Sequence, residues 1–341
     1  MAILYVTEQG ATIRHLAGRI VVRRENRIIT ELPDFKVEQI VIYGNAEMTS
    51  GARNYCFEQG IDVAYLSTTG RYRGRMENRL ARNAVLRQRQ QACVSDPEFC
   101  RRNAAAIVSG KIRNMAAMIR QQRRLRTDGR PLLAELEALL PRVAGARDLE
   151  ALNGYEGTAT ATYFKAFRAA LRGGWKFEAR QYHPPADPVN ALLSFGYTLL
   201  HNDVFAAINI VGLDPYSGTF HRPRQGHAAL ASDLQEELRA IVTDRLVLTA
   251  LNKRIIVETD FVLTPDGRFR LAQEALKRFL AMYARQISET VLYPAQGIRT
   301  SYRQVIELQA RQFARVVMGE EEVYRPFQPS EQGWATDREE A

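Results

Sequence analysis

The sequence has few of the features that mark secreted, membrane-spanning or disulfide-stabilised proteins. Its 341 residues include three cysteines, Cys56, Cys93 and Cys100, and no C-x-x-C pair. This odd number and spacing favour neither a disulfide framework nor a cysteine zinc site. No apolar run approaches the roughly 20 residues that span a bilayer. The first residues also lack the basic and apolar regions of a signal peptide, so we expect a cytoplasmic protein.

Two further absences narrow the function. The sequence contains no phosphate-binding loop of the form G-x-x-x-x-G-K-[ST], which indicates chemistry without ATP. It also contains no internal repeat and no low-complexity tract. A hydrophobic content of 46% and a charged content of 25% are typical of a globular protein with a proper core. The length favours about two domains.

Positive charge is concentrated in one part of the chain. Between Arg71 and Arg130 there are 16 Lys and Arg residues against 4 Asp and Glu, and this excess accounts for the net charge of +9. Almost all of these cations are arginines, whose guanidinium groups match phosphate oxygens in a bidentate way. Such localisation is typical of a protein that binds a polyanion. A solvated Arg-rich helix face is the alternative, and we favour nucleic acid.

The sequence predicts an α+β fold with a small N-terminal β-rich domain, residues 1–75, followed by a larger all-α catalytic domain, residues 76–325. Runs of β-branched and aromatic residues predict strands at 3–6, 20–22, 37–42 and 61–66. Residues 49–59 predict a helix that Gly60 would end.

From about residue 77, apolar residues recur with the helical period. Asp187 and Pro188 form a good helix start, with Asp as the cap and Pro at the first helical position. We expect helices at 77–92, 97–126, 131–142, 155–172, 188–211, 226–251, 271–290 and 298–318. Residues 326–341 are rich in Glu, Gln and Pro and predict a flexible tail.

Glu156 is the first candidate for chemistry. It lies in the phrase Asn153-Gly154-Tyr155-Glu156-Gly157, which the pattern places in the first turn of a helix. Taken alone, the phrase is explained by a capping box, in which Asn153 caps the helix and Glu156 reaches back to it. The small residues that follow would, however, leave room beside the carboxylate for another backbone or a substrate.

A second group of carboxylates lies near residue 235. Asp233 and Glu236 are three residues apart and share one face of a helix, and Glu237 is their nearest competitor. The alternative is a solvated acidic face. The preceding segment 228–231 is apolar and indicates a buried helix start, where a carboxylate pair needs a nearby cation.

His221 lies in a loop just before Arg222 and Arg224, and His227 is a second candidate that spacing alone does not exclude. One imidazole with two carboxylates gives a mixed nitrogen and oxygen site, which favours Mg²⁺ or Mn²⁺ over structural zinc. A basic surface beside such a site predicts metal-dependent chemistry on a nucleic acid phosphodiester.

At these residues the chain resembles the CRISPR-associated integrase-nuclease family of spacer acquisition, the Cas1 family. The resemblance covers nearly the whole chain, and its matching phrases lie at 153–157, 212–221, 230–237, 271–274 and 301–310. It implies that Glu156, His221 and Glu236 are the metal ligands and that Asp233 supports them in the catalytic set. The sequence departs from the family pattern at Ser232, where an apolar residue is usual, and at His227, where a basic residue is common. Neither departure removes a ligand.

The resemblance also implies an activity and partners. The protein would be a metal-dependent DNA integrase and endonuclease that inserts short foreign DNA fragments into a CRISPR repeat array by transesterification, with Mg²⁺ or Mn²⁺ as cofactor. Its partners would be DNA, a second copy in a homodimer, the small Cas2 protein and a fragment-processing nuclease. The N-terminal domain would dimerise and contact DNA, and the arginines expected to bind DNA are Arg71, Arg73, Arg75, Arg79, Arg82, Arg222 and Arg224.

Three alternatives to this function stay open at the level of sequence. The first is a metal-dependent DNA nuclease without integration, which would use the same ligands. The second is a non-enzymatic DNA-binding protein whose carboxylates only cap helices. The third is an oligomeric scaffold whose arginines serve solubility.

Overall fold

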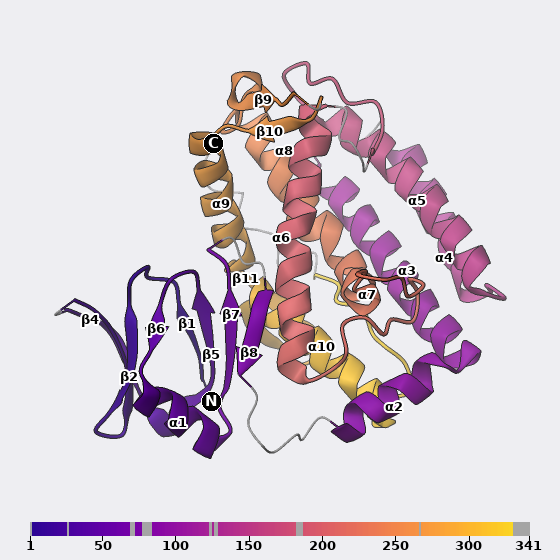
Figure 1. Cartoon of the computed structure of the whole chain (residues 1–341). Coiled ribbons are helices and arrows are strands. Elements are labelled where there is room, and N and C mark those ends of the chain that lie inside the picture. Colours follow the sequence, from indigo (N-terminus) through magenta and orange to yellow (C-terminus); the bar gives the residue numbers. More distant parts are fainter. Residues whose placement is uncertain are drawn as a thin grey trace.

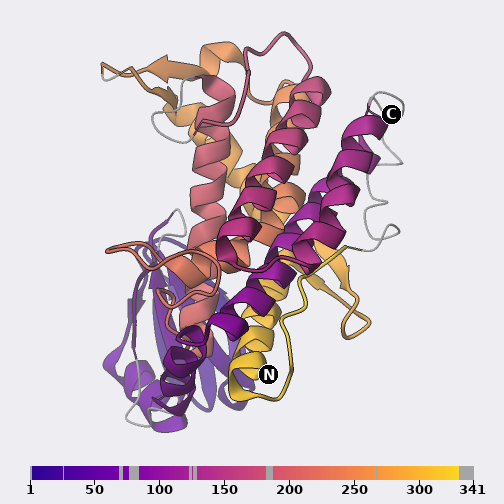
Figure 2. The same cartoon turned by 90° about the vertical axis from the view of Figure 1, so that its right-hand side faces the viewer.

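The computed structural model describes residues 2–25, 27–68, 72–76, 84–122, 125, 129–181, 187–265 and 267–329. A β-rich N-terminal part is followed by a larger helical part, which confirms the predicted α+β layout (Figure 1). The N-terminal sheets lie at the opposite end of the molecule from the hairpin of β9 (Phe261–Leu263) and β10 (Phe269–Leu271) in both views (Figures 1 and 2). None of the described helices is both long and apolar enough to cross a bilayer.

Two four-stranded sheets and one helix form the N-terminal part. In the first sheet, parallel pairs join β1 to β5 and β5 to β7, and β8 pairs with β7 antiparallel; its strands are β1 (Ala2–Val6), β5 (Val37–Tyr43), β7 (Asp62–Leu66) and β8 (Tyr72–Met76). The second sheet contains β4 (Arg27–Pro33), β3 (Arg19–Arg24), β2 (Thr12–Leu16) and β6 (Glu47–Met48).

Apolar side chains from both sheets and from α1 (Ser50–Gln59) share one core, which includes Ile13, Ile40 and Cys56. The predicted helix at 49–59 is confirmed, and it ends at Gly60, which has a φ of 70°. Strands β6 and β8 were not predicted, because β6 has two residues and charged side chains interrupt the apolar pattern of β8.

The helical part contains nine described α-helices. They are α2 (Ala84–Val94), α3 (Pro97–Gln121), α4 (Arg130–Ala144), α5 (Leu149–Ala170), α6 (Pro188–Val211), α7 (Ala229–Leu238), α8 (Arg245–Asn252), α9 (Gln273–Ile287) and α10 (Tyr302–Met318). Asp187 caps α6 by accepting a hydrogen bond from the backbone N–H of Asn190, so the predicted start at Pro188 is confirmed. Residues 77–83, where another helix was predicted to begin, lie outside the described residues.

The prediction of an all-α second domain was wrong in two places. Two antiparallel hairpins interrupt it: β9 (Phe261–Leu263) with β10 (Phe269–Leu271), and β11 (Thr290–Tyr293) with β12 (Ile298–Ser301). Strands of three or four residues are too short to show a period of two. The predicted helix 226–251 is also divided, because a π-helical segment, Arg239–Asp244, separates α7 from α8.

The start of α5 corrects the interpretation of Glu156. Asp148 caps this helix by accepting a hydrogen bond of 2.8 Å from the N–H of Ala151, and α5 begins at Leu149 rather than at residue 155. The amide of Asn153 donates to the carbonyl of Leu149. Asn153 and Glu156 therefore lie inside the helix, and the capping-box explanation of Glu156 was wrong.

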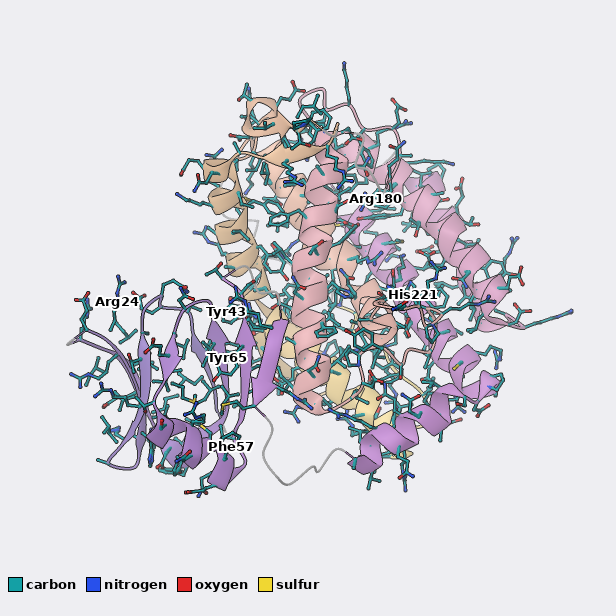
Figure 3. The ribbon with its side chains drawn as sticks, in the orientation of Figure 1. Arg24, Tyr43, Phe57, Tyr65, Arg180 and His221 are labelled. Carbon is teal, nitrogen blue, oxygen red and sulfur yellow. The ribbon has the colours of Figure 1, made fainter. Side chains whose placement is uncertain are left out.

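Arg303 of α10 connects the two parts of the molecule. Its guanidinium lies 5.4 Å and 5.6 Å from the ring centres of Tyr5 and Tyr43, and it donates to the Tyr43 hydroxyl and to Asp203 of α6. Figure 3 labels Tyr43, the last residue of β5. Nearby, Ala206 of α6 packs in one apolar cluster with the first sheet. These contacts seat that sheet against α6 and α10.

The start of the predicted tail is packed rather than free. The side chain of Phe327 is 2% exposed, and its backbone N–H donates to the carboxylate of Glu237. Residues 330–341 lie outside the described part of the chain.

Candidate active site

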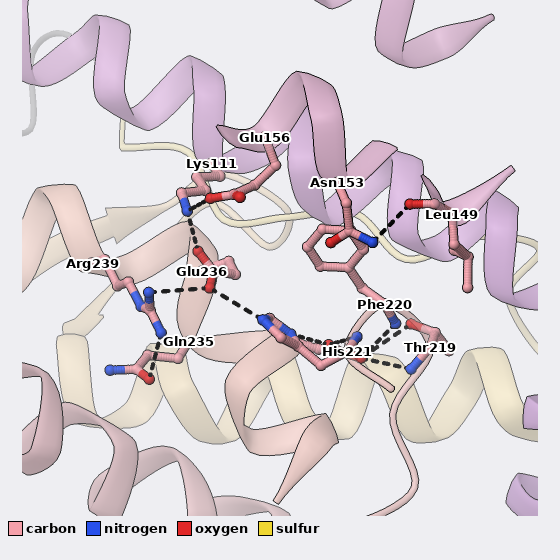
Figure 4. A network of polar contacts seen from close by, with 11 residues as sticks. Lys111, Leu149, Asn153, Glu156, Thr219, Phe220, His221, Gln235, Glu236 and Arg239 are labelled. Atoms are coloured by element: carbon pink, nitrogen blue, oxygen red, sulfur yellow. Dashed lines mark hydrogen bonds and ion pairs between the residues drawn. The ribbon is translucent and has the colours of Figure 1, made fainter. Parts of the chain in front are cut away.

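Two of the three side chains predicted as metal ligands contact one buried lysine, and the third faces one of those two carboxylates. Glu156 comes from α5, Glu236 from α7 and His221 from the loop before α7, while Lys111 comes from the middle of α3 (Figure 4). The ammonium of Lys111 forms an ion pair with Glu156 Oε1 and lies 2.6 Å from Glu236 Oε2. Four segments far apart in the sequence therefore meet at one cluster of charges.

His221 is held in a defined orientation by Asp233. Nδ1 of the imidazole lies 2.8 Å from Asp233 Oδ1, and Nε2 lies 3.9 Å from Glu236 Oε1. When Nδ1 carries the proton and donates it to Asp233, the lone pair of Nε2 is free for a ligand. Burial lowers the pKa of His221, but the hydrogen bond and the negative charge of Asp233 outweigh it and raise that pKa.

Asp233 supports the site through the backbone. Its side chain is fully buried, and its two oxygens accept hydrogen bonds from the N–H groups of Thr219 (2.6 Å), Phe220 (3.0 Å) and His221 (2.9 Å). Both oxygens are therefore occupied by the loop that carries His221. Among the predicted catalytic residues, Asp233 has the geometry of a positioning residue.

Glu237 faces a different part of the molecule. It accepts hydrogen bonds from the Tyr324 hydroxyl at 2.6 Å and from the side-chain amide of Gln309 at 3.0 Å. Burial raises its pKa to about 8, against those hydrogen bonds. Every residue of α7 is buried, so the alternative of a solvated acidic face was wrong. Adjacent residues on a helix point about 100° apart, which separates Glu236 from Glu237.

His227 is a neighbour of the site. Its ring stands edge-on to that of His221 with 5.8 Å between ring centres. In the described part of the chain, the imidazole that faces Glu236 is that of His221.

Lys111 and Arg239 complete the charge balance, and sequence reasoning missed both. The guanidinium of Arg239 lies 3.3 Å from Glu236 Oε1 and stacks on the Tyr197 ring at 5.0 Å. Burial raises the pKa of Glu236, but the positive charges of Arg239, Lys111 and His221 lower it to about 2. Lys111 did carry a signal, because it is the single lysine in the arginine-rich stretch 71–130.

The oxygen and imidazole ligands suit a divalent cation, although no three His, Cys, Asp or Glu side chains in the described residues are arranged to hold one directly. Glu236 Oε2 is buried and accepts no aligned hydrogen bond from the described residues, despite its ion pair with Lys111. Two ligands of one Mg²⁺ lie at most about 4.2 Å apart, twice a bond of about 2.1 Å. The 3.9 Å between Glu236 Oε1 and His221 Nε2 is within that limit. Lys111 lies between Glu156 and Glu236 and contacts one oxygen of each.

One side of the cluster is open. The side chains of Glu156 and His221 are 22% and 30% exposed, against 4% for Lys111 and 3% for Glu236. On the exposed surface of α5, a Cβ added to Gly154 or Gly157 would meet no atom within 4 Å. Packing against the described residues therefore does not require either glycine, and the helix surface next to Glu156 is open.

The arginines predicted to bind DNA divide into three groups. Arg73, Arg222 and Arg224 are exposed, the last two in the loop that follows His221. Arg75 is half-buried and donates to the carbonyl of Asn209, which ties β8 to α6. The remaining three lie outside the described residues: Arg71, Arg79 and Arg82.

Other members of the basic stretch also serve the fold. Arg87 donates to the carbonyl of Gly212 at 3.0 Å, and Arg89 donates to that of Met318 at 2.8 Å. Lys111 is buried among carboxylates. Only part of the positive charge is therefore available to a polyanion.

Comparison with known proteins gives one family. Residues 4–285 match the family model described as CRISPR associated protein Cas1. The CRISPR-associated endonuclease Cas1 3 of Thermus thermophilus is 35% identical over 329 residues, which cover 96% of this chain and 97% of that protein. The CRISPR-associated endonuclease Cas1 1 of Moorella thermoacetica is 34% identical, with 95% and 97% covered.

Longer relatives and solved structures agree. A Cas4 exonuclease/Cas1 endonuclease fusion of Geobacter sulfurreducens is 35% identical over 95% of this chain and 60% of the fusion. A chain of a partial Cas6-RT-Cas1–Cas2 complex is similar with a TM-score of 0.81 at 25% identity, covering 94% of this chain and 96% of that one. A casposase bound to integration product shares the fold, with a TM-score of 0.76 at 22% identity and 95% and 98% covered.

Proposed function

The chain belongs to the Cas1 family of CRISPR-associated endonucleases, and on that premise we propose that it is a metal-dependent DNA integrase that inserts short foreign fragments into a CRISPR repeat array. In this reaction the 3′-hydroxyl of a fragment attacks a phosphodiester at the edge of a repeat. One P–O bond forms and one breaks, the attacking hydroxyl loses its proton and the departing 3′-oxygen gains one. The number of phosphodiesters is unchanged, so ATP is not required.

The observation that carries this proposal is that Glu156 and Glu236 meet at one buried cationic group, Lys111, while Nε2 of His221 faces Glu236. Carboxylates that separate segments bring together around one positive charge are also placed to bind a metal cation. We propose that the two carboxylates and Nε2 of His221 hold Mg²⁺ or Mn²⁺. When bound, such an ion supplies Lewis acidity at the phosphoryl oxygens and favours ionisation of the attacking hydroxyl.

The surrounding residues would orient and balance this site. Asp233 fixes the imidazole of His221, and Arg239 offsets part of the charge of Glu236. Arg222 and Arg224 are exposed on the same loop as His221 and would contact DNA phosphates. Contacts of that kind supply affinity and position rather than sequence information.

Partners follow from the need to join two ends of a fragment. Two joining events at a fixed spacing favour a symmetric homodimer with two sites. Two similar solved chains belong to Cas6-RT-Cas1–Cas2 complexes, which supports a Cas2 partner for this chain. The fusion of a similar chain to a Cas4 exonuclease supports a separate nuclease that processes the fragment.

Integration with purified components tests the proposal. A fragment with free 3′-hydroxyls, a repeat-bearing plasmid and Mn²⁺ or Mg²⁺, with and without Cas2, should give joined products with the wild-type chain. Glu156→Gln should reduce the joining activity by at least about 100-fold, because it removes part of the charge stabilisation at the reacting phosphate. DNA binding should be retained. Lys165→Met, an exposed change on the same helix, is the control.

Joining by Glu156→Gln at the wild-type rate would show that the site is elsewhere. Cleavage of the plasmid without joined products in every metal and partner condition would instead favour the second candidate, a nuclease without integration. The names of the similar endonucleases keep that candidate open.

A further inference from the structure

We propose that Lys111 is an internal counter-ion that holds Glu156 and Glu236 together in the metal-free protein and must be displaced from between them by the divalent ion. The lysine would then set how tightly the site binds metal. This inference rests on the proposed metal site, and it adds a residue that competes with the metal for the charge of the same two carboxylates.

The first support is the place of Lys111 in the fold. It lies in the middle of α3, a helix of 25 residues that packs against both α5 and α7. The neighbouring side chains Val108 and Ile112 are fully buried or nearly so, and Lys111 itself is 4% exposed. A lysine this deeply buried requires compensation of its charge, and Glu156 and Glu236 provide that compensation.

The second support is the identity of the contacted atoms. The ammonium contacts Glu156 Oε1 and Glu236 Oε2, one oxygen from each carboxylate that the metal would use. Thr160 donates a further hydrogen bond of 2.8 Å to Glu156 Oε1 and keeps this carboxylate turned toward Lys111. An ammonium and a divalent cation repel each other, and each would draw on the negative charge of the same two carboxylates.

The third support is the sum of the charges. Glu156, Glu236 and Asp233 contribute three negative charges, and Lys111 and Arg239 contribute two positive ones. With a neutral His221 the cluster carries one net negative charge. Without Lys111 it would carry two, which matches one divalent ion. The lysine thus makes the metal-free cluster stable and weakens the attraction for metal.

Displacement is sterically feasible toward one side. Glu156 is the more exposed partner, and a Cβ added to the next residue, Gly157, would meet no atom of the described residues within 4 Å. The lysine side chain has four flexible carbons, so its ammonium can move toward this opening while its stem stays buried. The attraction between the Lys111 ammonium and Glu236 opposes this movement. Breaking that ion pair costs free energy, which reduces the affinity for the metal.

Mn²⁺ binding to the full-length chain without DNA tests the inference. Isothermal titration calorimetry would compare wild type with Lys111→Met, which keeps the length of the side chain and removes its charge. We expect Lys111→Met to bind Mn²⁺ at least tenfold more tightly and to melt at a lower temperature without metal. Lys165→Met, which removes an exposed charge from α5, should leave both quantities unchanged.

Two further variants separate the possible failures. Glu156→Gln should weaken Mn²⁺ binding, and a wild-type affinity in that variant would overturn the proposed metal site itself. If Glu156→Gln weakens binding but Lys111→Met binds Mn²⁺ equally or less tightly, the metal site stands and the competition by Lys111 is refuted. The latter result would assign the lysine a supporting role beside a bound ion.

The double variant Lys111→Met/Glu156→Gln gives a test that does not depend on metal. If the two side chains compensate each other, the double variant should melt above Lys111→Met alone, because it leaves one carboxylate fewer without its counter-ion. Independent effects that add up would contradict the pairing. If Lys111→Met folds only when Mn²⁺ is present, the proposal is supported, because the metal then replaces the positive charge that the two carboxylates have lost.

Discussion

At the scale of single residues, the site depends on which neighbour each carboxylate faces. Asp233, Glu236 and Glu237 lie within five positions of one buried helix, and each has a separate set of partners. Asp233 holds the His221 loop, Glu236 faces Lys111 and Arg239, and Glu237 binds the segment around Tyr324. Similar side chains thus acquire different roles from the 100° step of the helix.

Asp244 gives a residue-scale prediction about pH. The Tyr197 hydroxyl donates to its Oδ1 at 2.5 Å, and burial, the largest influence, raises the pKa of Asp244 to about 6. In the unfolded chain the pKa of an aspartate is about 3.9. The folded protein therefore binds this proton more tightly, and its stabilising effect is complete below about pH 4 and is lost as the pH rises through about 6.

We therefore expect wild type to lose stability relative to Asp244→Asn between pH 4 and pH 7, by a few kcal/mol at most, since one pKa unit corresponds to about 1.4 kcal/mol. Above pH 7 the difference should be constant. Urea unfolding of both proteins at several pH values measures it. A difference that does not change with pH would show that Asp244 titrates normally. Asp148→Asn, at an exposed helix cap, controls for general effects of removing a carboxylate.

At the scale of elements, α5 combines a buried core face with an exposed face that includes two glycines. Its core residues Leu152, Ala159 and Tyr163 are buried, whereas Gly154 and Gly157 are exposed and have open space around them. Glycine inside a helix lowers stability by about 1 kcal/mol relative to alanine. Since no contact with the described residues needs these glycines, we infer that they allow the close approach of DNA beside Glu156.

Gly157→Ala tests this role of α5. We expect the change to stabilise the fold by about 0.5–1 kcal/mol and at the same time to reduce integration, because the methyl group occupies the space beside Glu156. Chemical denaturation and the integration assay measure the two effects. Gly51→Ala in α1, where an added Cβ also meets no atom within 4 Å, should stabilise without loss of activity. Full activity in Gly157→Ala would contradict the role assigned to this face.

At the scale of the whole molecule, the sequence predicted the order of the parts better than their details. Capping at Asp187, the glycine stop at Gly60 and the long helical periods were local signals, and they identified the helices they mark. The start of α5 was missed because Asp148 and the phrase around Asn153 both resemble caps, and local pattern does not decide between them. The π-helical segment Arg239–Asp244 continues an apolar helical pattern, so periodicity did not reveal it.

The site was predicted in part for a similar physical reason. Glu156, His221 and Glu236 belong to recognisable phrases, and the structure brings them to one place. Lys111 was missed because its role depends on long-range packing of α3 against α5 and α7. Arg239 did carry a local signal, since it lies three residues after Glu236 on the same helical stretch. In the sequence, Lys111 belongs to a basic stretch whose other described members are largely on the surface or bound to helix ends, and only the fold separates it from them.

The most direct test of the account is a crystal structure of the full chain soaked in Mn²⁺, with anomalous scattering to locate the ion. We expect one strong peak within bonding distance of Glu156, Glu236 and Nε2 of His221, and the Lys111 ammonium moved away from between the two carboxylates. An ion bound elsewhere, or no ion at this cluster at a Mn²⁺ concentration that supports integration, would contradict the central claim.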